Sequence, residues 1–168
     1  MHLPGGYTVM LKWILVAASI AIASPAAAAD LDPLAFFTGR TQGDGKLKVV
    51  LKSPVTIGVE SRGKPDGRGG LVLEQVIREG SKPARTRRWV LRPTSPTTLQ
   101  GTLTDAKSPV RGSVSGRVLK LAYVREDGTH ASHVLTLRPD GRTMLNRMTI
   151  KKLGMVVARV EEVIRKLD

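Results

Sequence analysis

The chain has 168 residues and a formal net charge of +13, contains no cysteine, and only 4% of its residues are aromatic. Without cysteine it can form no disulfide, no thiolate metal site and no lipid anchor of the bacterial lipoprotein type. Few aromatic residues and no recognisable nucleic-acid motif argue against nucleic acid as a partner. The positive charge is spread along the chain, which indicates a solvated basic surface that would attract anionic head groups or other polyanions.

Residues 1–29 are predicted to be a cleaved signal peptide. Lys12 supplies the positive region, Trp13 to Ile22 the apolar region, and the alanines ending at Ala29 the cleavage site. We therefore expect an exported, periplasmic protein whose mature chain begins at Asp30.

The mature chain, residues 30–168, is expected to form one domain. Lys12 is the only charged side chain removed with the signal peptide, so the net charge of +13 becomes +12. The remaining length is sufficient for a single hydrophobic core. No later run reaches the roughly 20 apolar residues of a transmembrane helix. Met10 is a more natural start of the chain than Met1, because the residues before it do not resemble a signal-peptide start.

The mature chain opens with a predicted short helix. Asp32 before Pro33 is typical of a helix cap and first turn, and Gly39 is typical of a helix end. Such a helix would bury Leu34, Phe36 or Phe37.

Beyond this helix, apolar and polar residues alternate with period two, which predicts β-strands. We expect strands at residues 47–51, 55–59, 71–78, 86–92, 97–104, 112–115, 117–125, 130–138 and 142–152. Asp127-Gly128 and Asp140-Gly141 predict tight hairpins, and Pro93, Pro96 and Pro109 are expected at strand ends.

The last segment, residues 155–167, is compatible with two structures. Its valines fit a helical stripe, but Val156, Ala158 and Val160 also alternate as a strand would. We favour a strand, because so many antiparallel strands in one domain must hide their edges and need a closing partner. The predicted fold is therefore all-β, a single closed antiparallel barrel with a short N-terminal helix.

Several short motifs together resemble a known family. They are Leu34-Ala-Phe-Phe-Thr-Gly39, Leu73-Glu74, Arg87-Arg88-Trp89, Gly101-Thr102 with Asp105, and Asn146-Arg147 with Lys152, Gly154 and Val157-Ala158. Their order and spacing resemble the bacterial domain-of-unknown-function family numbered thirty-eight thirty-three. The resemblance implies a small lipocalin-like (calycin-type) envelope protein without an assigned activity. The chain departs from that family by lacking the lipoprotein cysteine and by having Val76 and Arg78 where aromatic residues are usual.

Asn146 is the first candidate for an interior site. It shares one face of the strand at 142–152 with Met144, Met148 and Ile150. An amide in this apolar row must find hydrogen-bond partners in the protein or in a ligand, since burying it bare costs about 1–3 kcal/mol.

Five further residues complete the predicted cluster. Glu74 could point into the barrel and pair with Arg87, although an ordinary ion pair at the strand rim is also compatible with the sequence. The predicted ligand-binding set, placed at the bottom of an apolar cup, is Glu74, Arg87, Trp89, Tyr123, His133 and Asn146.

Catalytic and metal-binding motifs are not recognised in the sequence. In a strand, His130 and Ser132 face one way and His133 the other, which separates the members of a metal pair or a Ser/His pair. Gly67-Arg-Gly-Gly70 lacks the lysine and the following helix of a phosphate loop. We expect no enzyme, no cofactor and no metal.

Two functions from different classes remain open. The first is an exported barrel that binds a lipidic or small apolar ligand in its interior. The second is a structural or interaction protein with a filled core, whose basic surface docks on an envelope polyanion or a partner. Free volume inside the barrel distinguishes them.

Overall fold

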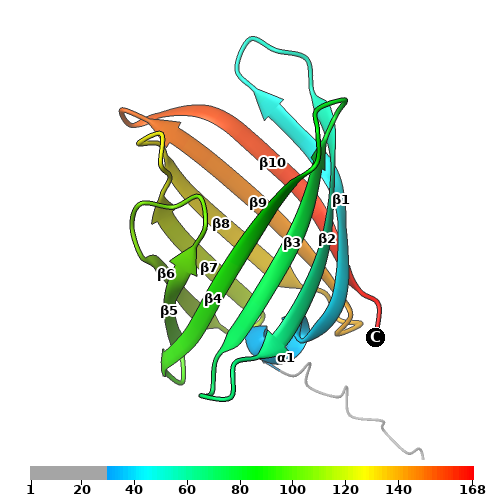
Figure 1. Ribbon diagram of the computed structural model, residues 1–168, viewed down its shortest axis with the longest axis vertical. Helices are drawn as coiled ribbons and strands as arrows, with labels where there is room; N and C mark the ends of the chain where they lie inside the picture. The colour runs from blue at the N-terminus through cyan, green and yellow to red at the C-terminus, as the bar shows by residue number, and fades with distance from the viewer. Residues whose placement is uncertain (1–29) are drawn as a thin grey trace, which may run out of the picture.

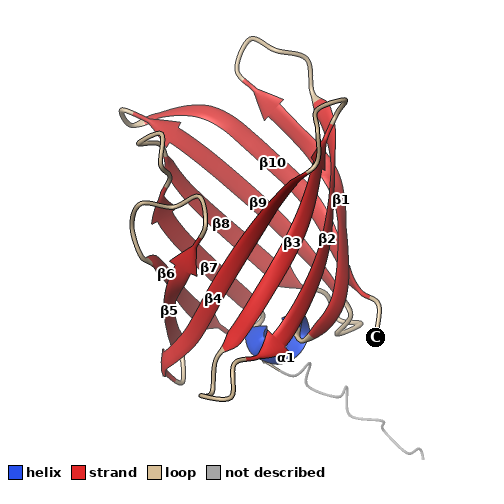
Figure 2. Ribbon diagram, viewed as in Figure 1, coloured by secondary structure: helices blue, strands red, loops and turns tan. Residues whose placement is uncertain are grey.

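The computed structural model describes residues 30–168, and the predicted signal peptide at 1–29 lies outside them. In the described part, ten antiparallel strands form a closed barrel in which each strand pairs with its sequence neighbours and β1 pairs with β10 (Figures 1 and 2). The strands are β1 (Gly39–Val49), β2 (Val55–Pro65), β3 (Leu71–Glu79), β4 (Arg85–Ser95), β5 (Thr98–Leu103), β6 (Val110–Ser115), β7 (Val118–Val124), β8 (His130–Leu137), β9 (Thr143–Lys152) and β10 (Met155–Lys166). The predicted all-β barrel is therefore confirmed. No helix among residues 30–168 combines the length and apolar character that crossing a membrane requires.

Strand β9 follows the predicted register. Met144, Asn146, Met148 and Ile150 are all buried, whereas Arg147 between them is exposed. Because side chains alternate across a strand, burying one of these residues places all four in the interior.

One end of the barrel is closed by α1 (Pro33–Phe37), at the bottom of Figure 1. The side chain of Asp32 caps this helix by accepting hydrogen bonds from the amides of Leu34 and Ala35, at 2.9 and 3.0 Å. Phe36 and Phe37 are both buried, with an edge-to-face ring contact of 5.0 Å. The predicted short helix is confirmed, and its two phenylalanines close this end of the barrel with apolar side chains.

The carboxyl end of the helix is held by the last strand. The Lys166 ammonium group donates hydrogen bonds to the carbonyls of Ala35 and Phe36, at 3.3 and 3.0 Å, and to that of Thr38. A cation at a helix C-terminus satisfies carbonyls that have no partner inside the helix. The two ends of the described part of the chain, residues 30–168, thus meet at the closed end of the barrel.

Several strand boundaries differ from the sequence predictions: β1 already begins at Gly39 rather than 47, and β2 continues to Pro65 rather than 59. Leu51 was expected in a strand, but β1 ends at Val49 and Leu51 lies in the connection to β2 with a positive φ of 61°. Pro93 was expected to end a strand, but β4 continues to Ser95 past a register shift, and such an irregularity tolerates a residue without an amide hydrogen. The helical alternative for the last segment is wrong, because β10 closes the barrel against both β1 and β9.

Candidate functional site

The half of the barrel that lies away from α1 contains a cavity of about 380 Å³. Its wall is mostly apolar and includes Leu47, Ile57, Ile77, Met148, Ile150 and Val160. Charged side chains line it as well, namely Glu79, Lys82, Arg85, Arg125 and Asp127. Only about 60 Å³ of free space remains in the half below, which is lined in part by Phe37. Arg87, His133, Asn146 and Glu162 line both spaces, so they form the floor of the upper cavity.

A chain of hydrogen bonds crosses this floor. The amide nitrogen of Asn146 donates to Glu162 Oε2 at 2.9 Å, and its oxygen lies 3.1 Å from His133 Nδ1. Because that oxygen can only accept, His133 carries its hydrogen on Nδ1. Its Nε2 is then an acceptor for the hydroxyl of Tyr123, 3.4 Å away.

Burial shifts the pKa values of the three titratable residues in this chain of hydrogen bonds. Desolvation, assisted by the charge of Arg87, lowers the pKa of His133 to about 4, so the imidazole is neutral at pH 7. Desolvation also raises the pKa of Glu162, against the opposing effects of the Asn146 hydrogen bond and the Arg87 charge. Burial raises the pKa of Tyr123 as well, which keeps its hydroxyl protonated as a donor.

A second group of hydrogen bonds is centred on Gln75. Its side-chain oxygen accepts from Trp89 Nε1 at 2.7 Å and from Arg87 Nη2 at 3.2 Å, and its nitrogen donates to Ser61 Oγ at 3.1 Å. The guanidinium of Arg87 also lies 5.5 Å from the centre of the Trp89 ring, in cation–π range. Neighbouring strands β2, β3 and β4 thus hold Arg87 in place.

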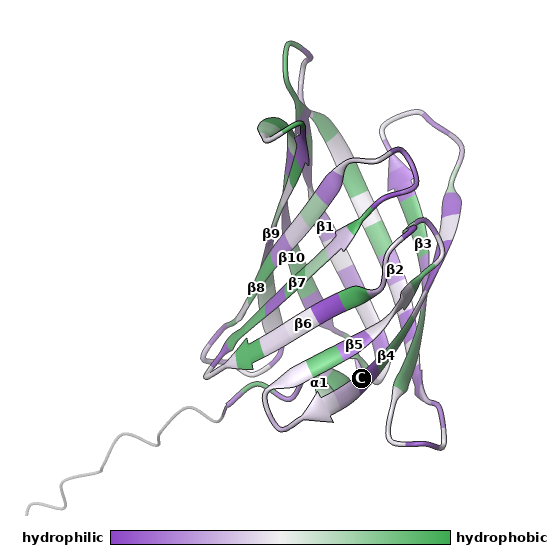
Figure 3. Cartoon of the chain, turned by 90° about the vertical axis from the view of Figure 1, so that its left-hand side faces the viewer, coloured by the Kyte–Doolittle hydropathy of each residue, from purple (hydrophilic) through white to green (hydrophobic). Residues whose placement is uncertain are grey.

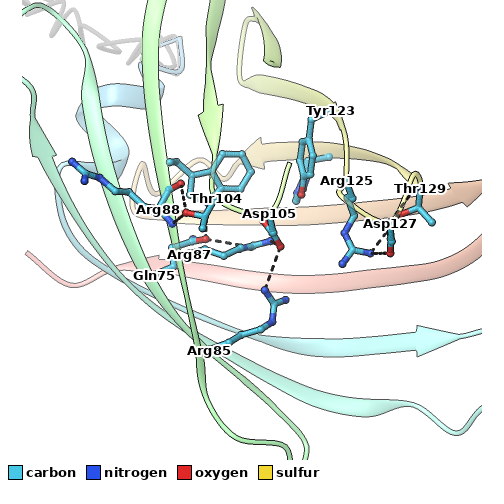
Figure 4. Close-up of polar contacts among 12 residues, drawn as sticks. Gln75, Arg85, Arg87, Arg88, Thr104, Asp105, Tyr123, Arg125, Asp127 and Thr129 are labelled. Atoms are coloured by element: carbon cyan, nitrogen blue, oxygen red, sulfur yellow. Dashed lines mark hydrogen bonds and ion pairs between the residues drawn. The ribbon is translucent and has the colours of Figure 1, made fainter. Parts of the chain in front are cut away.

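The charge of Arg87 is only partly balanced. Its Nη1 is 3.8 Å from Asp105 Oδ2, and Arg85 shares the same oxygen at 3.4 Å (Figure 4). Within residues 30–168, Nε of Arg87 and Oδ1 of Asp105 are buried without a hydrogen-bond partner. Desolvation accordingly lowers the pKa of Arg87.

Aromatic rings connect the two groups. Trp89 contacts Tyr123 edge to face with centroids 5.7 Å apart, and Tyr123 stacks on His133 at 5.8 Å. These contacts limit the rotamers of the polar side chains, which favours a preformed site.

The structure brings together five of the six predicted site residues. Arg87, Trp89, Tyr123, His133 and Asn146 all point into the barrel, and all but Arg87 are buried. The prediction for Glu74 is wrong. Its side chain is exposed and its strand neighbour Gln75 turns inward, because β3 directs Leu71, Leu73 and Ile77 into the core.

The sequence analysis did not identify Gln75 and Glu162 as interior residues, although the sequence contains a signal for each. Gln75 lies on the face of β3 that carries leucine and isoleucine, which is more apolar than the face with two valines. Glu162 continues the inward row of Ala158 and Val160, and would have been found by extending the last strand.

The remaining histidine motif is divided as the strand periodicity predicts. His130 and Ser132 are exposed on the outside of β8, whereas His133 is buried. Among residues 30–168, no three His, Asp or Glu side chains are grouped so that they could hold a metal ion.

The fold defines a class of small lipocalin-like antiparallel barrels. The crystal structure of Rv2717c from M. tuberculosis matches with a TM-score of 0.60 and 19% identity, covering 83% of this chain and 100% of that one. The S-type phycobiliprotein lyase CPES from Guillardia theta matches with a TM-score of 0.62 and 6% identity, covering 80% of this chain and 90% of that one. At these identities the likeness concerns the fold.

The chain belongs to the family described as "Protein of unknown function (DUF3833)", whose sequence profile matches residues 16–166. The resemblance found in the short motifs is therefore confirmed. No curated protein matches the sequence significantly.

Proposed function

We propose that the barrel binds a small, largely apolar or lipidic molecule in its open-ended cavity, with an anionic or hydrogen-bond-accepting end of that molecule against Arg87. The observation that carries this proposal is an incompletely paired guanidinium at the floor of an apolar cavity of about 380 Å³. Pockets for small-molecule ligands typically have volumes of about 300–1,000 Å³, mostly apolar walls and a few polar groups that fix orientation.

Arg87 has more donors than acceptors around it. A guanidinium offers five N–H groups, but one hydrogen bond, to Gln75, is formed with the described residues, and the ion pair with Asp105 is long and shared. A ligand carboxylate could accept two parallel hydrogen bonds from this group and restore its charge balance. An apolar chain attached to that carboxylate would occupy the space lined by Ile77 and Met148.

Binding, rather than catalysis, is the activity we propose. The titratable groups at the floor, His133 and Glu162, are joined through the amide of Asn146, which fixes the orientation of both. This arrangement supports a rigid polar surface for a ligand.

A fluorescent fatty acid and its methyl ester test the proposal. The chain beginning at Asp30 is titrated with parinaric acid and with methyl parinarate, which differ in the charge that would meet Arg87. We expect the acid to bind more tightly, and Arg87→Met to weaken acid binding by about tenfold or more with little effect on the ester, since hydrogen bonds to charged groups contribute about 1.5–3 kcal/mol.

Matched variants separate the interior from the outer surface. Arg88→Met removes the adjacent, outward-facing arginine and should leave both affinities unchanged. Ile77→Trp fills the cavity and should abolish binding of both probes, whereas Val76→Trp on the outer face should not. Equal affinities for Ile77→Trp and the unmodified protein would contradict interior binding. Mass spectrometry of the gently purified protein then identifies the natural ligand among co-purifying lipids.

We also propose that the protein is exported to the periplasm. This proposal rests on the signal-peptide pattern of residues 1–29. Amino-terminal sequencing of protein from the envelope fraction should give a chain beginning at or next to Asp30, and an uncleaved chain in the cytoplasm would contradict it.

A further inference from the structure

Two neighbouring hairpins at the open end carry most of the exposed apolar surface. They are the β1–β2 hairpin and the β9–β10 hairpin, which are adjacent because β1 pairs with β10. Five of the seven large apolar side chains exposed within residues 30–168 lie on them: Val50, Leu51, Val55, Leu153 and Met155. Leu51 is 100% exposed and Leu153 is 89% exposed, and green, hydrophobic segments are visible at the upper end of the barrel in Figure 3.

The backbone conformation at these two tips disfavours leucine. Leu51 and Leu153 have φ angles of 61° and 49°, and Gly154 follows with 81°. Two successive positive φ angles define the tight hairpin turn in which asparagine and glycine are usual. Leucine is disfavoured in the left-handed region, so its presence at both tips indicates a use outside the barrel.

Lysines flank both tips, on hairpin segments that themselves carry no carboxylate. Residues 46–57 and 147–160 contain no aspartate or glutamate. Lys48 and Lys52 flank the first tip, Lys151 and Lys152 precede the second, and all four are exposed. An exposed apolar group flanked by cations, on a segment without carboxylates, has the chemistry of a segment that meets an anionic lipid surface.

We propose that these two hairpins dock the open end of the barrel on an anionic lipid bilayer. Leu51 and Leu153 enter the boundary between head groups and acyl chains, and the four lysines contact the anionic head groups while their methylene stems cover apolar surface. Separate convex tips suit a deformable bilayer, and charge complementarity selects an anionic one.

The docking surface is a second site, separate from the proposed interior site. It lies at the end of the barrel where the cavity opens, so docking would orient the cavity towards the lipid. Leu47, Val49 and Val157 line the cavity at the same end, on the strands that lead to the tips. In addition, the amide of Val50 donates to the Val157 carbonyl at 3.0 Å, which joins the base of one tip to the strand of the other. Docking would therefore place the cavity mouth against the lipid surface.

Co-sedimentation with lipid vesicles tests the proposal. The chain beginning at Asp30 is mixed with phosphatidylcholine vesicles with and without phosphatidylglycerol. We expect binding only when phosphatidylglycerol is present. The double variant Leu51→Asn, Leu153→Asn should bind about tenfold or more weakly, because two leucines no longer enter the bilayer. Asparagine suits a positive φ, so the thermal unfolding midpoint should stay the same or rise.

Two controls match this variant in chemistry. Val134→Asn removes an exposed apolar side chain from the outside of β8 and should leave vesicle binding unchanged. Lys151→Gln with Lys152→Gln should weaken binding clearly more than Lys64→Gln with Lys120→Gln, which removes the same charge elsewhere on the barrel. Equal losses in both lysine pairs, or unchanged binding of the double asparagine variant, would show that diffuse charge alone causes binding and would overturn the proposal.

Insertion and self-association are measured separately. In the mature Leu153→Trp variant, the only other tryptophan is the buried Trp89, so a blue shift on vesicle addition and quenching by brominated lipids report entry of the tip. If ultracentrifugation without lipid shows a dimer that dissociates on Leu51→Asn, Leu153→Asn, the tips form an interface between copies and the proposal is overturned. Parinarate binding without vesicles tests the interior site alone, so the two proposals can fail independently.

Discussion

The end of the barrel that holds α1 keeps Leu71, Leu119 and Met144 almost without exposure, whereas the opposite end contains a cavity of about 380 Å³ and two exposed leucines. The first end resembles the close-packed interior of an ordinary domain. The second leaves apolar side chains without packing partners, which lowers stability but makes room for a ligand. Polar residues at the floor of the cavity separate the two halves.

The largest effect is expected from truncating the closed end. Leu119→Ala removes a fully buried side chain and should lower the free energy of unfolding by about 2–5 kcal/mol. The matched change Leu47→Ala, in the half-buried wall of the cavity, should cost no more than about 1 kcal/mol, because less contact is lost. Urea unfolding measures both. Equal losses would mean that the open end is as tightly packed as the closed end.

The next effect is a loss of stability in mild acid caused by His133. Its pKa is about 4 in the folded barrel against 6.5 in a model compound, so below pH 6.5 the unfolded chain binds a proton that the folded chain does not. The free energy of unfolding is therefore unaffected by the titration of His133 above pH 6.5. As the pH falls from 6.5 towards 4 it decreases by about 3 kcal/mol, at 1.36 kcal/mol per pKa unit.

A comparison of variants isolates this histidine. Glu162 acts in the opposite direction, since its raised pKa contributes stability below 4.5 that is lost as pH rises. His133→Gln should therefore flatten the loss of stability between pH 6.5 and 4, whereas the exposed-site control His130→Gln should retain it. The same acid dependence in both variants would assign the effect to another group.

Asn146→Leu tests the floor itself. The substitution leaves Glu162 without its donor and His133 without its acceptor, so stability should fall by about 1–3 kcal/mol with or without parinaric acid. Arg147→Leu, on the outside of the same strand, should stay within about 0.5 kcal/mol. Loss of probe binding at unchanged stability would instead mean that Asn146 serves the ligand.

The smallest predicted effect concerns the helix that closes the barrel. Asp32→Ala removes the side chain that accepts two amide hydrogen bonds of α1 and should cost about 1 kcal/mol. Asp30→Ala, two residues earlier and outside the cap, is the control. The rate of hydrogen exchange at the α1 amides should rise only in Asp32→Ala. If Asp32→Ala also changed the affinity for parinaric acid, the two ends of the barrel would be coupled.

Much of the barrel could be predicted from alternation alone. Apolar residues at every second position placed Met144, Asn146, Met148 and Ile150 on one inward face, and the structure confirms that face. The capped helix was predicted from Asp32 and its following proline for an equally local reason.

Where the alternation of apolar residues was ambiguous, only the tertiary structure decided which face of a strand is buried and whether a segment is a strand. Strand β3 has apolar residues on both faces, so its local pattern cannot fix which face turns inward. If one face points inward Glu74 lies in the interior, and if the other does Gln75 lies there. The last strand was uncertain because valines suit both a helical stripe and a strand. Closure against β1 and β9 resolved it and carried Glu162 to the floor.

The sequence by itself therefore determined the class of fold and most of the interior row, because side-chain direction in a strand depends only on neighbouring residues. Tertiary structure decided which polar groups meet. Asn146 and Glu162 come from paired positions of β9 and β10, and Arg87 and Gln75 from paired positions of β4 and β3. Contacts of this kind depend on strand register around a closed barrel, and register is set by all ten strands together.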